Sequence, residues 1–163
     1  MSYFETIPSL DELEDRAVET LSRRDMRALM FHLLYAAEAH EYHLSIEALV
    51  DMFNNGYKLN IPKEGELFTM TAGIIHNRDQ LDTVIVPLLH NWRFDRLSVA
   101  TKLILRMALW ELQHTQTSPS IIMNEAIELA KCFAELDAYK FINGILDEYV
   151  KKHVILPDTE SKS

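Results

Sequence analysis

Apolar side chains recur at intervals of three and four residues along most of this chain, which is the spacing of one face of an α-helix. The clearest run contains Met26, Leu29, Met30, Leu33 and Leu34. Only four glycines and five prolines interrupt the 163 residues. The pattern therefore predicts an all-α fold, a single compact helical bundle of about seven helices, and no β-sheet.

Polar residues at the ends of these runs predict where the helices begin and end. Ser9, Ser22 and Ser45 precede apolar runs, as helix N-caps do. The expected helices cover residues 9–21, 22–37, 45–54, 63–90, 98–114, 121–135 and 138–153. A loop is expected at 55–62, and a bend or break at Gly73 or Asn77 leaves open whether 63–90 is one helix or two.

Acidic residues concentrate at the N-terminus. Residues 1–21 contain six acids against Arg16 alone, so they contribute -5 to the formal net charge of -9. We expect an acidic N-terminal extension helix over 1–21, a helical domain over 22–153 and a disordered tail over 154–163. The overall charge opposes nucleic-acid binding, but the body of the chain carries much less of it than the extension.

Several classes of site lack the residues that they require. The single cysteine, Cys132, excludes a disulfide framework and a cysteine-based zinc site, and it suits a reducing compartment. No apolar stretch resembles a signal peptide or a membrane span. Glu111 and His114 form the only Glu-x-x-His pair, and glycine-rich phosphate loops are absent from the sequence. We predict a cytoplasmic protein that is not an enzyme, with no catalytic residues, metal or cofactor.

Three segments resemble the NusB family in sequence, order and spacing. The most specific is Asn124-Glu125-Ala126-Ile127-Glu128-Leu129-Ala130-Lys131, which is followed nine residues after Lys131 by Lys140-Phe141-Ile142-Asn143-Gly144-Ile145-Leu146-Asp147. The second runs from Trp92 to Leu97 and on to Ile104–Leu112, and the third is the basic stretch Arg23–Arg27. The resemblance covers roughly residues 22–153. On physical grounds, Asn143-Gly144 within a helix suggests a close helix approach or an inter-helix hydrogen bond.

The resemblance implies a function in transcription. A NusB-like chain is expected to pair with the NusE ribosomal protein of the small subunit and to bind the single-stranded boxA RNA of ribosomal RNA leaders. The pair then joins the RNA polymerase antitermination complex. Whether the free chain is a monomer or a homodimer is left open.

The resemblance also implies an RNA site. Arg23, Arg24 and Arg27 would position the RNA backbone, and Phe133 and Phe141 would stack on bases. Asp137 would accept a hydrogen bond from a base edge, and Lys140 would contact a phosphate. Because Phe133 shares a helical face with Leu129, a purely core role is the alternative for it.

A partner surface and a competing function are also open. We expect partner contacts from Glu66 and Met70 and from the helix that carries Arg106 and Glu111. The chain departs from the family at Asp25, which interrupts the arginines, and at the turn 134–138, where glycine and serine are usual. The alternative is therefore a protein-only adaptor that has lost RNA binding. In that case the acids at 11–19 would cover the arginines, or would only keep the chain soluble.

Overall fold

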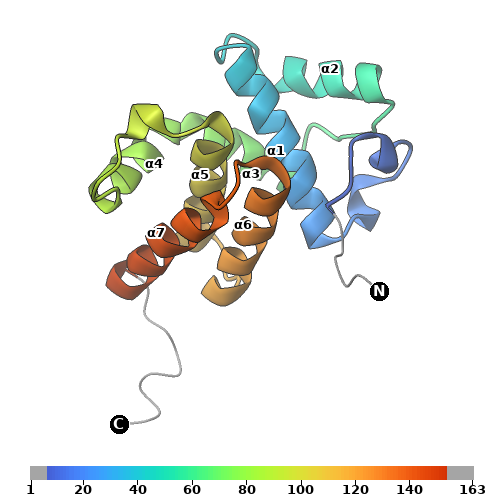
Figure 1. Cartoon of the computed structure of the whole chain (residues 1–163). Coiled ribbons are helices and arrows are strands. Elements are labelled where there is room, and N and C mark those ends of the chain that lie inside the picture. The colour runs from blue at the N-terminus through green and yellow to red at the C-terminus, as the bar shows by residue number, and fades with distance from the viewer. Residues whose placement is uncertain (1–6, 154–163) are drawn as a thin grey trace.

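The computed structural model describes residues 7–153, so the predicted disordered tail at 154–163 lies outside the described residues. The described part contains seven α-helices and no β-strand, which confirms the all-α prediction (Figure 1). The helices are α1 (Arg23–Ala39), α2 (Ile46–Tyr57), α3 (Glu66–His76), α4 (Arg78–Ile85), α5 (Val99–His114), α6 (Pro119–Phe133) and α7 (Ala138–His153).

Serine caps fix the starts of three helices. The side chains of Ser22, Ser45 and Ser98 each accept a hydrogen bond from the backbone N–H three residues later. Each bond satisfies one of the N–H groups that a helix start leaves without a partner. Pro119 occupies the first position of α6, where the absence of an N–H costs nothing.

The segment between α2 and α5 differs from the prediction at one end. α2 continues to Tyr57 and ends where Lys58 adopts a left-handed φ of 53°. The loop that was expected to begin at residue 55 therefore begins at Lys58. Asn54 explains the longer helix, because its side chain accepts from Ile61 N at 2.8 Å and donates to Ile61 O at 3.0 Å. Farther along, the helical stretch 63–90 divides at Asn77 into α3 and α4, followed by a 3-10 turn at Val86–Leu88.

The acidic N-terminal segment is not a helix, and that prediction is wrong. It forms two 3-10 turns, Asp11–Leu13 and Val18–Thr20, on either side of Asp15, whose φ is 61°. Asp15 N donates to Lys58 O at 3.1 Å, and Ala17 forms a parallel bridge with Asn60. Pairing with the α2–α3 loop thus overrides local helix propensity. Leu13 and Val18 are buried, so the segment is part of the core.

α5 lies at the centre of the bundle (Figure 1). Buried side chains lie on all sides of this helix. Each of the following is at most 3% exposed: Leu103, Ile104, Leu105, Met107, Ala108 and Leu109. A helix that is apolar on all sides has to be covered by other elements. α1 and α6 pack against α5, and α7 packs along α6. Side chains of α1 also reach α6, since Arg24 contacts Glu125 and Phe31 contacts Phe133.

Candidate nucleic-acid interface

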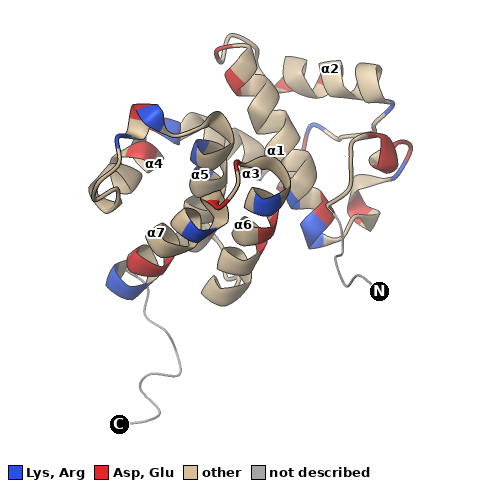
Figure 2. Ribbon diagram, viewed as in Figure 1, with Lys and Arg blue, Asp and Glu red and all other residues tan. Residues whose placement is uncertain are grey.

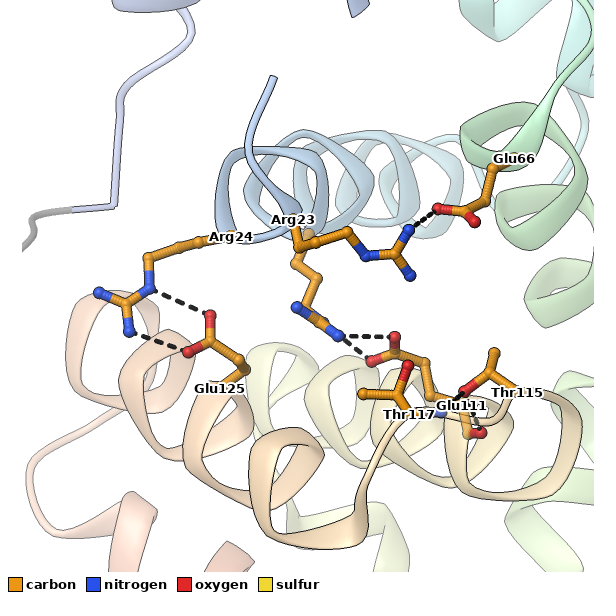
Figure 3. Close-up of polar contacts among 8 residues, drawn as sticks. Arg23, Arg24, Glu66, Glu111, Thr115, Thr117 and Glu125 are labelled. Carbon is orange, nitrogen blue, oxygen red and sulfur yellow. Dashed lines mark hydrogen bonds and ion pairs between the residues drawn. The ribbon is translucent and has the colours of Figure 1, made fainter. Parts of the chain in front are cut away.

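The three arginines at the start of α1 are paired with glutamates from other helices. Arg23 donates to Glu66 of α3. Arg24 donates to Glu125 of α6 through Nε at 3.0 Å and Nη2 at 2.8 Å (Figure 3). The side chains of Arg24 and Glu125 are 21% and 13% exposed, whereas that of Arg23 is 52% exposed. Arg23 is therefore the most accessible of the three arginines.

Arg27 lies inside the bundle. Its Nε and Nη2 atoms each donate to Glu111 of α5 at 2.9 Å, and the two residues are only 6% and 4% exposed. A guanidinium that is buried and bidentately paired is not presented to a phosphate strand. The geometry gives Arg27 a role in joining α1 to α5, in place of the predicted RNA contact.

Phe133 lies at the C-terminal end of α6, between the core and the surface. Its ring stacks on Phe31 at a centroid distance of 4.5 Å and meets His32 edge-on at 5.1 Å. Phe133 itself is partly exposed and packs against the core. His32 has a buried Nε2 with no hydrogen-bond partner in the structure, and burial lowers the pKa of this histidine.

The turn between α6 and α7 is held against α5. Glu135 accepts hydrogen bonds from Ser98 Oγ at 3.0 Å and Thr101 Oγ1 at 2.9 Å. Burial opposes its ionisation, but these bonds and one from its own backbone outweigh burial and lower the pKa of Glu135. Asp137 follows with a left-handed φ of 68° and an exposed carboxylate. The turn thus presents Asp137 from a fixed backbone.

Basic and aromatic side chains alternate at the start of α7. Lys140 Nζ lies 3.6 Å from Asp137 and 5.9 Å from the ring centre of Tyr139, and Lys131 Nζ lies 4.9 Å from the same ring. Phe141 is half-buried and meets Trp92 edge-on at 5.2 Å. We call Lys131, Phe133, Asp137, Lys140 and Phe141 the α6–α7 surface. The sequence prediction did not name Lys131, Tyr139 or Trp92 as site residues, although Lys131 and Trp92 lie within its motifs and Tyr139 lies beside one.

The arginines at the start of α1 and the α6–α7 surface lie apart along the axes of α1 and α6. Arg24 contacts Glu125, while Phe31, two turns farther along α1, contacts Phe133 on α6. Eight residues of α6 correspond to about 12 Å. The two groups therefore lie about two helical turns apart along the α1–α6 pair. Lys and Arg are interspersed with Asp and Glu over the ribbon in Figure 2, and do not form one continuous basic face in that view.

Of the four predicted partner residues, only Glu66 is exposed. Met70, Arg106 and Glu111 are 5%, 6% and 4% exposed. Arg106 donates to Asp82 through Nε and Nη2, both at 2.7 Å, and to Tyr42 Oη at 3.3 Å. Burial and a hydrogen bond to Glu38 raise the pKa of Tyr42 to about 12. Arg106 thus joins α5 to α4 and to the end of α1 within the monomer.

Residues 7–153 contain neither a metal-binding cluster nor a membrane-spanning helix. No group of three potential metal ligands comes together there. The Glu-x-x-His pair is divided, because Glu111 is buried against Arg27 while the exposed ring of His114 stacks on Trp110 at 4.4 Å. None of the helices there is long and apolar enough to cross a membrane.

Comparison with known proteins identifies the family. A family model described as the NusB family matches residues 24–151. The chain belongs to the NusB family. Transcription antitermination protein NusB of Staphylococcus epidermidis is 34% identical over 127 residues, which are 77% of this chain and 96% of that protein. The same-named protein of Staphylococcus aureus is 34% identical over 132 residues, or 80% of this chain and 100% of that protein.

A solved structure agrees with this assignment. T. maritima NusB superimposes with a TM-score of 0.72 at 28% identity, covering 88% of this chain and 99% of that one. The resemblance predicted from the motifs at residues 92–112 and 124–147 is thus confirmed. The NusB relatives are named for transcription antitermination, which is not an enzymatic role.

Proposed function

We propose that the chain is a cytoplasmic transcription antitermination factor that forms a heterodimer with the NusE ribosomal protein and binds single-stranded boxA RNA of ribosomal RNA leaders. The pair would then join the RNA polymerase antitermination complex. Besides family membership, the observation that carries the proposal is the α6–α7 surface, where cations and partly exposed aromatic rings alternate around a rigid turn. This combination is typical of surfaces that bind single-stranded nucleic acid.

Each residue of the α6–α7 surface has a chemical role in this proposal. Phe141 and the exposed part of Phe133 offer ring faces on which unpaired bases stack. Asp137 offers a carboxylate that accepts from a base N–H group. Lys131 and Lys140 offer exposed ammonium groups to phosphates. The side chains come from one turn and its two flanking helices, so they are positioned together.

The paired arginines explain why a partner is needed. RNA has to compete with Glu66 for Arg23 and with Glu125 for Arg24, and the chain carries a net charge of -9. Few counterions are then released from RNA when the chain binds alone, which predicts weak binding with a shallow salt dependence. A basic protein partner would supply the additional phosphate contacts.

The partner surface is proposed at α3. Burial removes Met70, Arg106 and Glu111 from the candidates, whereas Glu66, Thr69 and His76 of α3 are exposed. Glu66 already binds Arg23, so a partner at this surface would contact that ion pair. Binding of the partner and release of Arg23 toward RNA would then be coupled.

The test is a titration of fluorescent boxA RNA with the purified protein, with and without the NusE ribosomal protein, over a series of salt concentrations. We expect tight binding only with the partner. Lys140→Ala should lower both the affinity and the salt slope, the latter by about 0.7 for one lost single-strand phosphate contact. Lys63→Ala is the matched control, because Lys63 is an exposed lysine that pairs with Asp51 away from α6 and α7.

The protein-only adaptor is the second candidate, and the arginine pairing favours it. All three arginines at the start of α1 donate to glutamates of the same chain. If the NusE ribosomal protein binds but RNA never does at any salt concentration, the chain is a protein-only adaptor.

A further inference from the structure

A pocket of about 350 Å³ adjoins the α6–α7 surface and shares Lys140 and Phe141 with it. One wall is the loop after the 3-10 turn at 86–88, which contributes His90, Asn91 and Trp92. The other wall is α7, which contributes Lys140, Phe141, Gly144 and Glu148. We call it the α7 pocket. Its size falls at the lower end of the roughly 300–1,000 Å³ of small-ligand sites.

Gly144 forms part of this pocket, and nothing among residues 7–153 requires a glycine there. A Cβ built on Gly144 meets no atom within 4 Å, so the close helix approach suggested by the sequence is absent. Glycine is a poor helix former, and it is used in a helix where another group approaches the backbone. Gly73 is the contrast, since a Cβ there would lie 2.9 Å from Trp110. Gly144 therefore leaves the α7 side of the pocket open among the described residues.

Trp92 forms the aromatic wall of the pocket. It is 59% exposed, which is unusual for so large an apolar side chain, and its ring meets that of Phe141 edge-on at 5.2 Å. An aromatic pair that keeps a ring face open to a pocket is suited to stacking a planar ligand. Phe141 also belongs to the α6–α7 surface, so the pocket continues that surface.

The rim of the pocket is polar and charged. Glu148 accepts from Lys152 at 2.7 Å and contacts His90 Nε2 at 2.8 Å, and these two hydrogen bonds lower the pKa of Glu148 and keep it ionised. The rim therefore offers an acceptor at Glu148 and an ammonium group at Lys140. An amino-bearing base edge and its phosphate would match these two groups, whereas an apolar peptide side chain would match neither.

We propose that the α7 pocket holds one unpaired base of the bound RNA, stacked on the Trp92 indole above Gly144, with Lys140 near its phosphate. The proposal rests on the RNA-binding function proposed above and adds a second base site to it. It commits to a nucleobase as the occupant, and a protein side chain is an outcome of the test.

The test compares the same substitution at two helical glycines. Gly144→Leu fills the pocket, whereas Gly56→Leu is the matched control in α2, outside the pocket; both side chains enter free space, so the fold is retained. With the NusE ribosomal protein present, Gly144→Leu and Trp92→Ala should weaken boxA RNA binding about 5- to 150-fold, the range for one lost stacking contact, while Gly56→Leu binds like wild type. An RNA that lacks one base should bind the wild-type protein more weakly than intact RNA does. The Gly144→Leu variant should bind the two RNAs equally.

Intrinsic fluorescence gives an independent readout. RNA should quench the wild-type tryptophan emission, and Trp92→Phe should lose this quenching although Trp110 is still present. If all variants bind RNA as wild type does, the pocket holds no base and the inference falls while the proposed function stands. If Gly144→Leu lowers only the affinity for the protein partner, measured without RNA, the occupant is a protein and the inference is wrong. If wild type binds no RNA even with the partner, the proposed function and the inference both fall.

Discussion

The Arg27–Glu111 pair should be worth more to folding than any surface ion pair of this protein. Arg27→Met keeps the apolar stem but leaves the Glu111 carboxylate without its guanidinium at 4% exposure. Breaking a buried pair in this way costs about 3–5 kcal/mol. At about 2–4 °C per kcal/mol for a chain of this size, the Tm should fall by roughly 6–20 °C. The double variant Arg27→Met/Glu111→Leu should recover most of the loss, because no buried charge is left.

The assay is thermal and urea unfolding followed by circular dichroism. Lys63→Ala is the control, because it removes an exposed pair with Asp51 and should cost less than about 1 kcal/mol. The reasoning is refuted if Arg27→Met lowers the Tm no more than Lys63→Ala does. A loss of RNA affinity in Arg27→Met without a loss of stability would show that Arg27 acts at the surface.

Three further predictions concern stability and RNA affinity. Gly144→Ala should raise the free energy of unfolding by about 0.5–1 kcal/mol, whereas Gly73→Ala should lower it by about 1–3 kcal/mol because its Cβ meets Trp110; urea midpoints that change in the same direction would contradict this. Burial depresses the pKa of His32, so the unfolded state binds the proton more readily and the fold loses stability as the pH falls below about 6.5. The Tm of His32→Phe relative to that of wild type should therefore rise as the pH is lowered from 7 to 5. A Tm difference that does not change with pH would exclude the effect. Glu66→Gln should free Arg23 and raise both the RNA affinity and the salt slope, and an unchanged slope in the RNA titration would argue against competition at Arg23.

Local chemistry made much of the fold predictable. The starts of α1, α2 and α5 depend on Ser22, Ser45 and Ser98, each of which bonds a backbone group only three residues away. The apolar faces of the helices follow from spacing in the same way. The division at Asn77 is also local, because its backbone N–H and its side chain both bond Gly73 O.

The errors arose where distant residues decide the structure. The acidic segment has a helix-like pattern, but Asp15 and Ala17 pair with the α2–α3 loop more than 40 residues away. Arg27 looks like its neighbours Arg23 and Arg24 in the sequence, and only Glu111, 84 positions later, gives it a buried position. No local pattern reveals which arginine of a cluster faces inward.

Part of the candidate site could be predicted from local sequence motifs, and the rest depends on distant residues. The motif at 140–147 named Lys140 and Phe141, which the structure places on α7 in the lining of the α7 pocket, and their contact with RNA stays a prediction. Trp92 belongs to a different motif, and only the fold brings its ring to Phe141. Its exposure, which distinguishes it from a core tryptophan, is a property of the folded chain.

The most direct test of the account is the affinity of the protein and its NusE partner for boxA RNA as a function of salt, with Lys140→Ala/Phe141→Ala compared with Lys63→Ala. The account predicts tight binding by wild type with the partner, an equal affinity for the control, and a loss of both affinity and salt slope in the double variant. Equal RNA binding by all three proteins would contradict the placement of RNA on the α6–α7 surface.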